Sequence, residues 1–224
     1  MNDRKRAVRY GISFVILAVL LIFLFIWNVN SGSIHLSVQE ILNIIFRHQG
    51  DEISYNIVWE IRLPRILSVI ILGGALSVSG FLLQTFFNNP IAGPFVLGIS
   101  SGAKLIVAFL MIFLLSRSVS IGSGAMILAA FAGSMISMGF VLLVAKKVHN
   151  MSMLVISGVM IGYICSAITD FVVTFADDSN IVNLHNWSLG SFSGMTWGNV
   201  RTMAVVVLLT MVIVFFMSKP ISAY

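Results

Sequence analysis

The stretch GGALSVSGFLLQTFFNNPIAGPFVLG, residues 73–98, lies within a run without charged residues that extends from Ile66 to Ala103. That run is longer than the about 20 apolar residues that one helix needs to cross a bilayer. It is interrupted by the sequence NNP at 88–90 and by Pro94. Proline removes a backbone donor and disfavours helical dihedral angles in the residue before it. The stretch therefore predicts two membrane-spanning helices joined by a polar turn.

The composition predicts the same class of fold for the rest of the chain. Hydrophobic residues make up 58% of the 224 residues and charged residues 9%, and the mean hydropathy is +1.03. A soluble core is excluded by these values. We expect an all-α, polytopic transmembrane bundle that forms one domain over residues 1–224. Six stretches are long and apolar enough to span: Tyr10–Asn28, Ile66–Phe87, Phe95–Leu115, Ile121–Ala145, Ser152–Ala176 and Arg201–Ser218.

The distribution of charge predicts the orientation of these spans. With the amino terminus in the cytoplasm, the inner segments carry a net charge of +6 and the outer segments −1, which agrees with the positive-inside rule. All four tryptophans then fall near the outer interface, where indole rings prefer to lie. The basic balance thus reflects membrane topology and gives no reason to expect nucleic-acid binding. We expect a multi-pass protein of the cytoplasmic (inner) membrane of a bacterium.

Several kinds of chemistry are not supported by the sequence. Cys165 is the only cysteine, and the four histidines have no metal-ligand spacing, so we expect no metal site. There is no G-x-x-x-x-G-K-[ST] motif for nucleotide hydrolysis, and no catalytic arrangement of serine, histidine or carboxylates. The chain is not expected to be an enzyme.

Small residues recur every three or four positions along several of the predicted spans. Such stripes let helix backbones approach closely within a membrane. They predict a packed bundle and by themselves say nothing about function. The stripes are Gly73, Ser77, Gly80 and Gln84; Ala129, Gly133 and Ser137; and Gly158, Gly162, Ser166 and Asp170.

The segment between the first two spans predicts a short amphipathic surface helix. In SVQEILNIIFR, residues 37–47, Ser37 and Glu40 have the spacing of a capping box. The expected apolar face consists of Val38, Ile41, Leu42, Ile45 and Phe46. The segment before the last span, residues 177–199, mixes Gly and Ser with two tryptophans and is expected to dip into the interface.

The order of motifs resembles that of the FecCD-type permease subunits of ABC importers for iron-siderophores, haem and cobalamin. The resemblance begins with RLPR at 62–65 and continues through a span with Gly73, Leu76, Ser79, Gly80 and Gln84. It extends to ISGVMIGYICSA at 156–167 and WSLGSFSGMTW at 187–197. Asn88, Ile91, which replaces the usual Leu, and Lys104 depart from the family pattern. The turn that joins the second and third spans and the residues after it supply the remaining matches: Asn89, Pro90, Ala92, Pro94, Leu97, Gly98, Gly102 and Ala103.

The resemblance implies a function and a set of partners. The chain would be the permease subunit of an ATP-driven importer of metal chelates, foremost iron-siderophores, working with a second permease subunit, two ATPase subunits that bind the ATP, and an extracytoplasmic binding protein. Members of the family have ten spans and a cytoplasmic coupling segment after the sixth, so we expect that four spans and this segment are absent. Two alternatives remain open from the residues alone: an ion-coupled secondary transporter, or a membrane scaffold without transport activity.

Four polar residues carry specific expectations. Arg62 and Arg65 either extend to the interface, where their stems contact lipid, or dock acidic residues of the binding protein, as the family resemblance implies. Gln84 is expected to form an interhelical hydrogen bond. Lys104 and Asp170 lie within predicted spans, where a charge is costly and therefore faces the bundle interior; whether the two pair is left open.

Overall fold

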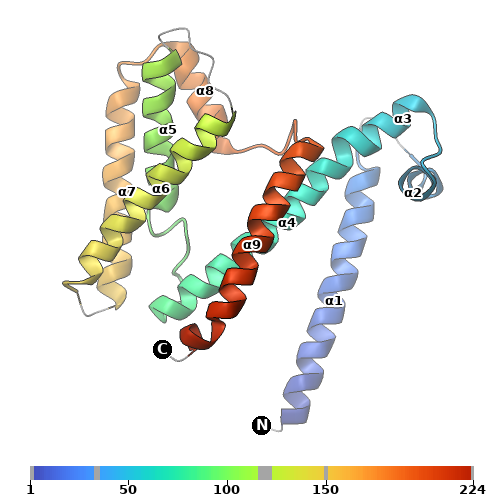
Figure 1. The fold of residues 1–224 in the computed structure, drawn as a ribbon, viewed down its shortest axis with the longest axis horizontal. Helices are drawn as coiled ribbons and strands as arrows, with labels where there is room; N and C mark the ends of the chain where they lie inside the picture. The colour runs from blue at the N-terminus through green and yellow to red at the C-terminus, as the bar shows by residue number, and fades with distance from the viewer. Residues whose placement is uncertain (1–2, 33–35, 116–122, 149–150, 223–224) are drawn as a thin grey trace. The chain divides into compact units, whose positions relative to one another are not determined.

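The computed structural model describes residues 3–32, 36–115, 123–148 and 151–222, and these residues form helices and turns without a strand. The expected all-α class is therefore confirmed (Figure 1). Arg117 and the start of the expected fourth span, residues 121–122, lie outside the described residues. The helices are α1 (Asp3–Asn30), α2 (Val38–Arg47), α3 (Glu52–Asn56), the π-helix η1 (Ile57–Arg62), α4 (Leu63–Phe87), α5 (Ile99–Leu115), α6 (Ser123–Ala145), α7 (Met151–Val173), α8 (Asp178–Leu189) and α9 (Trp197–Ser222).

The chain divides into two compact units. Unit 1 comprises Met1–Gly74 and Phe192–Phe215, and unit 2 comprises Ala75–Ser191 and Phe216–Tyr224. Unit 1 holds α1, α2, α3, η1, the first half of α4 and most of α9. Unit 2 holds the second half of α4 together with α5, α6, α7 and α8. The helix α5 packs against α6, α7 and α8. The expectation of a single domain over the whole chain stays a prediction.

Five helical segments among the described residues are long and apolar enough to cross a membrane. They are Lys5–Asn30, Glu52–Phe87, Gly124–Ala145, Ser152–Val173 and Trp197–Met217. The expected span Phe95–Leu115 is shorter, because its helix begins only at Ile99. Its first four residues belong to the turn, which ends at Gly98 with a φ of 71°. The second span is longer than expected, since the helix that ends at Phe87 already begins at Glu52.

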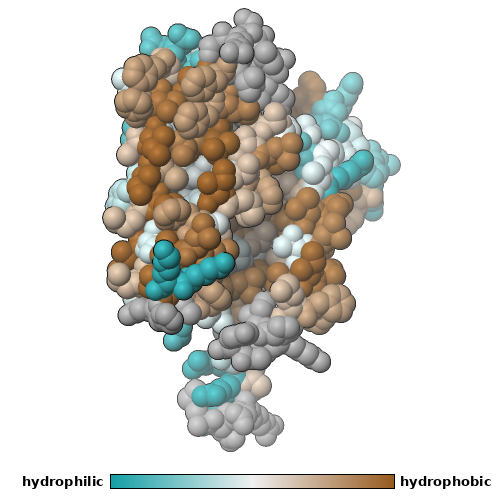
Figure 2. Space-filling view, turned by 60° about the vertical axis from the view of Figure 1, so that its left-hand side comes forward, coloured by the Kyte–Doolittle hydropathy of each residue, from teal (hydrophilic) through white to brown (hydrophobic). Residues whose placement is uncertain are grey.

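Apolar side chains are exposed over most of the spans. Phe14, Phe81 and Leu208 are between 64% and 73% exposed, and Figure 2 shows hydrophobic residues over broad areas of the surface. A monomeric soluble protein rarely exposes apolar surface on this scale. The exposed surface is therefore suited to lipid and to other subunits.

The helix α2 has the predicted capping box. The Ser37 hydroxyl accepts from the Glu40 N–H at 3.2 Å, and the Glu40 carboxylate accepts from the Ser37 N–H at 2.7 Å. The hydrogen bond from the Ser37 backbone and a second one from its hydroxyl lower the pKa of Glu40, because both favour the ionised carboxylate. The box therefore supports the helix while Glu40 is ionised and loses this support as the pH falls through that lowered pKa.

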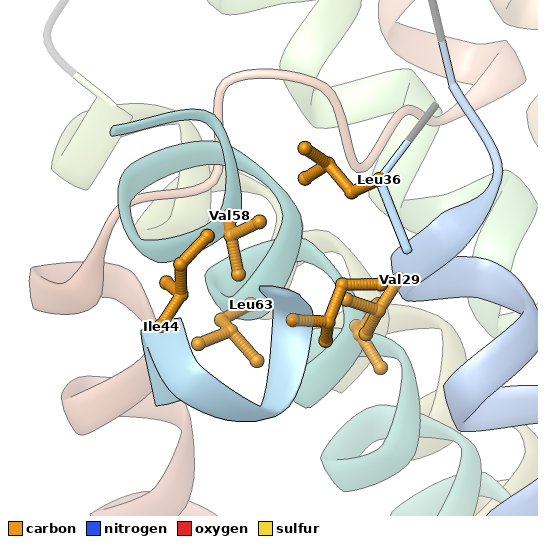
Figure 3. Close-up of a cluster of buried hydrophobic side chains, with 7 residues drawn as sticks. Val29, Leu36, Ile44, Val58 and Leu63 are labelled. Carbon is orange, nitrogen blue, oxygen red and sulfur yellow. The ribbon is translucent and has the colours of Figure 1, made fainter. Parts of the chain in front are cut away.

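The predicted apolar face of α2 is wrong for two of its residues. Ile41 and Ile44 are buried, at 4% and 1% exposure, whereas Leu42 and Phe46 are exposed. The side chain of Val38 lies outside the described residues. Apolar residues extend around more of the surface of α2 than α1 and η1 cover. Only the side that carries Ile41 and Ile44 packs against these two helices. Figure 3 shows this buried cluster, with Ile44 close to Val58 and Leu63.

Candidate functional site

The turn between α4 and α5 is built by the asparagines and glycines that interrupt the charge-free run. Asn88 adopts a left-handed φ of 46°, and the Asn89 side chain accepts the Ile91 N–H at 2.9 Å. Such side-chain bonds to the backbone stabilise tight turns. Ala92 and Leu97 are buried in a cluster with residues of α6 and α7. The polar turn predicted from the sequence is therefore present, and it packs into unit 2.

Two glycines of α7 make room for the end of this turn. A Cβ added at Gly158 would lie 2.9 Å from the Leu97 Cα, and one at Gly162 would lie 3.3 Å from the Gly98 Cα. The carbonyl oxygen of Gly98 accepts a hydrogen bond from the Ser137 hydroxyl of α6 at 2.9 Å. The first half of the predicted stripe on α7 thus lies closest to the backbone of the turn, and the Ser101 hydroxyl of α5 is 3.7 Å from a Cβ added at Gly162.

A second glycine contact joins α5 to α6. A Cβ at Gly102 would lie 2.6 Å from the carbonyl oxygen of Gly133, and a Cβ at Gly133 would overlap the carbonyl group of Gly102. Each glycine therefore permits the other helix to approach. The sequence placed Gly102 in the turn motif and Gly133 in a packing stripe, but it did not indicate that the two meet.

The two glycines of the stripe on α4 have no such close neighbour among the described residues. No described atom lies within 4 Å of a Cβ added at Gly73 or Gly80, and Ser77 and Gln84 are exposed. The expected close packing and interhelical hydrogen bond of Gln84 are therefore not observed among the described residues. The packing of this stripe against another helix stays a prediction.

The second half of α7 exposes a polar stripe. Tyr163, Ser166 and Asp170 follow one another at three- and four-residue spacing, so they share one narrow face. Tyr163 is 72% exposed, and the other two are also exposed. The packing stripe predicted from Gly158 therefore turns outward at Ser166. Ionisable residues within spans usually face a water-filled cavity or another protein surface, and this face presents three polar groups that could contact a polar ligand.

Lys104 lies on a different element from this stripe. It is half-buried in α5, and no ion pair links it to Asp170 in the described structure. Within that structure no cluster of three or more histidine, cysteine, aspartate or glutamate residues could hold a metal ion.

Arg62 and Arg65 have different surroundings in unit 1. The Arg62 side chain is only 9% exposed, and its Nη1 donates to the carbonyl oxygen of Val29 at 2.5 Å. Its guanidinium occupies the space that a Cβ at Gly32 would need. Arg65 is exposed and lines a groove of about 570 Å³. From the sequence, the same roles were expected for both arginines. In the structure, Arg62 is buried and Arg65 is exposed.

The π-helix η1 ends at Arg62, and Leu63 separates it from the buried Pro64. The Leu63 N–H bonds to the carbonyl oxygen of Val58 rather than to that of Trp59, and Pro64 has no N–H to donate. The carbonyl oxygen of Trp59 thus lacks both possible partners within its own helix. The indole Nε1 of Trp197 donates to it at 2.9 Å, which satisfies a backbone acceptor that would otherwise be orphaned.

The family of the chain follows from a match over most of its length. Residues 20–224 match the model of the FecCD transport family. The chain belongs to the FecCD transport family. This confirms the resemblance that the motifs indicated, and a family of transport proteins agrees with the expectation that the chain is not an enzyme. With its apolar helices, the chain is a multi-pass membrane protein.

Individual relatives agree with the family. The chain is 37% identical over 140 residues to the vitamin B12 import system permease protein BtuC of Escherichia coli (strain K12 / DH10B) and to that of Shigella boydii serotype 18. The match covers 62% of this chain and 42% of the relatives, so the chain spans less than half of their length. A solved structure described as an inward-facing metal-chelate type ABC transporter matches with a TM-score of 0.74 and 23% identity, over 92% of this chain and 61% of that one. At 23% identity, the likeness to this solved structure shows the fold alone.

Two features of this FecCD member were missed in the sequence. The hydrogen bond from Trp197 to Trp59 joins residues 138 positions apart, and no local pattern indicates such a pair. The helix α8 was expected only as a segment that dips into the interface. It forms twelve residues of helix and buries Leu184 against α5. The position of Asp177 before that helix is a typical start signal that could have indicated it.

Proposed function

We propose that the chain is part of the transmembrane permease of an ATP-driven importer of metal chelates. The observation that carries the proposal is the family match over residues 20–224. Iron-siderophores are the cargo that the motif resemblance favours, and cobalamin is the second candidate because the relatives named above import vitamin B12. The amino terminus would lie in the cytoplasm, as the charge distribution predicts.

The polar stripe of α7 is proposed to face the route of the chelate. Tyr163, Ser166 and Asp170 offer hydroxyl and carboxylate groups on an exposed face of an otherwise apolar helix. Transport needs polar groups that contact a hydrophilic cargo along its path, whereas lipid offers them no partner. The stripe runs from the middle of α7 toward its carboxyl end, so it would serve the outer half of that route.

Replacing Asp170 by alanine should weaken cargo recognition. Hydrogen bonds to a charged group contribute about 1.5–3 kcal/mol, so the KM for chelate uptake should rise by roughly ten- to a hundredfold. The amount of assembled transporter should not change, because Asp170 is exposed and has no ion-pair partner in the described structure. Uptake kinetics in cells and the yield of purified complex would measure both quantities. An unchanged KM at unchanged yield would exclude Asp170 from the route. Thr202→Ala, an exposed substitution on α9, is the control.

The proposed partners are a second permease subunit, two ATPase subunits and an extracytoplasmic binding protein. ATP would be bound by the ATPase subunits. The stripe of α4 from Gly73 to Gln84 is suited to helix contacts with another chain, because no described atom lies within 4 Å of a Cβ added at Gly73 or Gly80. The docking of a binding protein through Arg62 and Arg65 is also a proposal. The burial of Arg62 leaves Arg65 as the more accessible of the two.

Cargo uptake in cells tests this proposal against the alternatives. Accumulation of radiolabelled ferric siderophore or cobalamin should require the gene and should stop when ATP is depleted. It should continue when a protonophore dissipates the ion gradient while ATP is maintained. Loss of uptake with the protonophore alone would favour an ion-coupled secondary transporter, and no uptake of either chelate would favour a scaffold.

A further inference from the structure

The groove that Arg65 lines runs between α1 and the first turns of α4, wholly within unit 1. Leu17, Leu21 and Leu24 form its wall on α1, and Val69 and Ile70 form part of its wall on α4. From Leu17 to Asn28 it follows α1 over about 16 Å, given a rise of 1.5 Å per residue. Its volume of about 570 Å³ is within the usual range for sites that bind small molecules.

The polar residues of the groove are gathered at one end. Trp27, Asn28 and Arg65 lie at the carboxyl end of α1 and the start of α4, and apolar side chains, aliphatic apart from Phe25 and Phe192, line the remainder. A single phospholipid has the same division, with an anionic phosphate at one end and an apolar chain at the other. Indole rings and arginines are also the residues that lie at the level of lipid headgroups.

The lining residues also discriminate between possible occupants. None of the described residues that line the groove is Gly, Ala or Ser, although membrane helices usually meet across small residues. None is acidic, so the single charge of the site is the positive charge of Arg65. A headgroup with net negative charge complements it better than a zwitterionic one, whose amine would have no carboxylate to contact.

From these observations we propose that unit 1 binds one anionic phospholipid. An acyl chain occupies the groove between α1 and α4, and the phosphate accepts hydrogen bonds from the guanidinium of Arg65. The lipid belongs to the leaflet that contains the carboxyl end of α1. The site is independent of the cargo, and it assigns a role to Arg65 that Arg62 cannot share, because the Arg62 side chain is directed to the carbonyl oxygen of Val29.

Spin-labelled lipids test the site in bilayers of phosphatidylcholine that contain the purified protein. Contact with the protein restricts the motion of part of the labelled lipid. This restricted fraction should be larger for labelled phosphatidylglycerol than for labelled phosphatidylcholine. Arg65→Gln should reduce this preference by roughly fivefold, whereas Arg65→Lys should keep most of it and thereby show that the fold is intact. Arg201→Gln, at an exposed arginine of α9 that does not line the groove, is the matched control and should change nothing.

A second substitution tests the groove itself. Leu21→Trp should fill part of the volume and lower the restricted fraction of both lipids. An unchanged fraction would place the lipid elsewhere and overturn the proposal. A preference for phosphatidylglycerol that survives Arg65→Gln would also overturn it. If Arg65→Gln weakens the docking of a binding protein while the lipid preference stays, Arg65 serves docking and the proposal is wrong.

Discussion

Replacing Gly133 by leucine should prevent unit 2 from packing correctly. A Cβ at this position would overlap the carbonyl group of Gly102, and its next neighbour, Ile106 Cγ1, is 2.9 Å away. The closest atoms belong to a helix backbone, which cannot move aside as the end of a side chain can. Overpacking of cores typically costs about 1–3 kcal/mol, and we expect at least that here. Thermal unfolding followed by circular dichroism, together with the yield of folded protein, would measure the loss.

Gly139 provides the matched control for this substitution. It lies in the same helix, α6, and nothing lies within 4 Å of a Cβ placed there. Gly139→Leu should therefore leave stability nearly unchanged. Gly80→Leu in α4 should behave like the control in the isolated chain and become harmful only where another subunit covers that face. Equal stability of the Gly133 and Gly139 variants would show that α5 and α6 do not cross at the two glycines.

Replacing Trp197 by phenylalanine should destabilise unit 1. The phenylalanine ring can still pack near Trp59, whose ring centroid lies 5.6 Å from that of Trp197, but it cannot donate to the Trp59 carbonyl oxygen. A fully buried acceptor left without a partner costs about 1–3 kcal/mol, and the hydrogen bond to Trp59 is part-buried, so we expect a loss at the lower end of this range. Trp187→Phe is the control, since the described structure gives its indole no hydrogen bond. A similar change in unfolding temperature for both variants would contradict the role of the hydrogen bond.

Pro64 allows this explanation to be tested more sharply. In the π-helical register, an N–H on residue 64 would face the carbonyl oxygen of Trp59. Pro64→Ala supplies that donor, so the loss caused by Trp197→Phe should be smaller in the Pro64→Ala background. A double-mutant cycle with unfolding free energies measures the difference. Additive effects would show that Pro64 is not the reason why Trp197 is needed.

The local chemistry of the sequence predicted those parts of the fold that depend on neighbouring residues. The turn after α4 followed from Asn88 to Pro94, and the capping box from Ser37 and Glu40, because each depends on residues a few positions apart. The start of α5 was predicted four residues too early, since apolar residues after Pro94 look alike whether they are helical or in a turn. The helix through Pro64 was missed because the π-register accommodates a proline that would end an ordinary helix.

The arrangement of the candidate site depends on contacts between elements that are distant in sequence, and local patterns do not predict such contacts. The residues from Gly158 to Asp170 repeat every four positions and were predicted to form one packing face. A helix has 3.6 residues per turn, so each step of four rotates the next residue further around the helix axis. Gly158 therefore packs while Asp170 is exposed. Arg62 and Arg65 lie three residues apart and look equivalent in sequence. The Arg62 guanidinium is directed inward and donates to the carbonyl oxygen of Val29, 33 residues away in sequence, and no local pattern indicates such a contact.

ATP-driven uptake into liposomes tests the central proposal most directly. The protein would be purified from its host with the subunits that accompany it and reconstituted, and accumulation of labelled chelate would be followed after addition of the binding protein. We predict that uptake needs ATP on the side of the ATPase subunits, and that it falls when Asp170 is replaced by alanine. Accumulation without ATP, or no accumulation of any siderophore, haem or cobalamin by an intact ATPase-containing complex, would contradict the account.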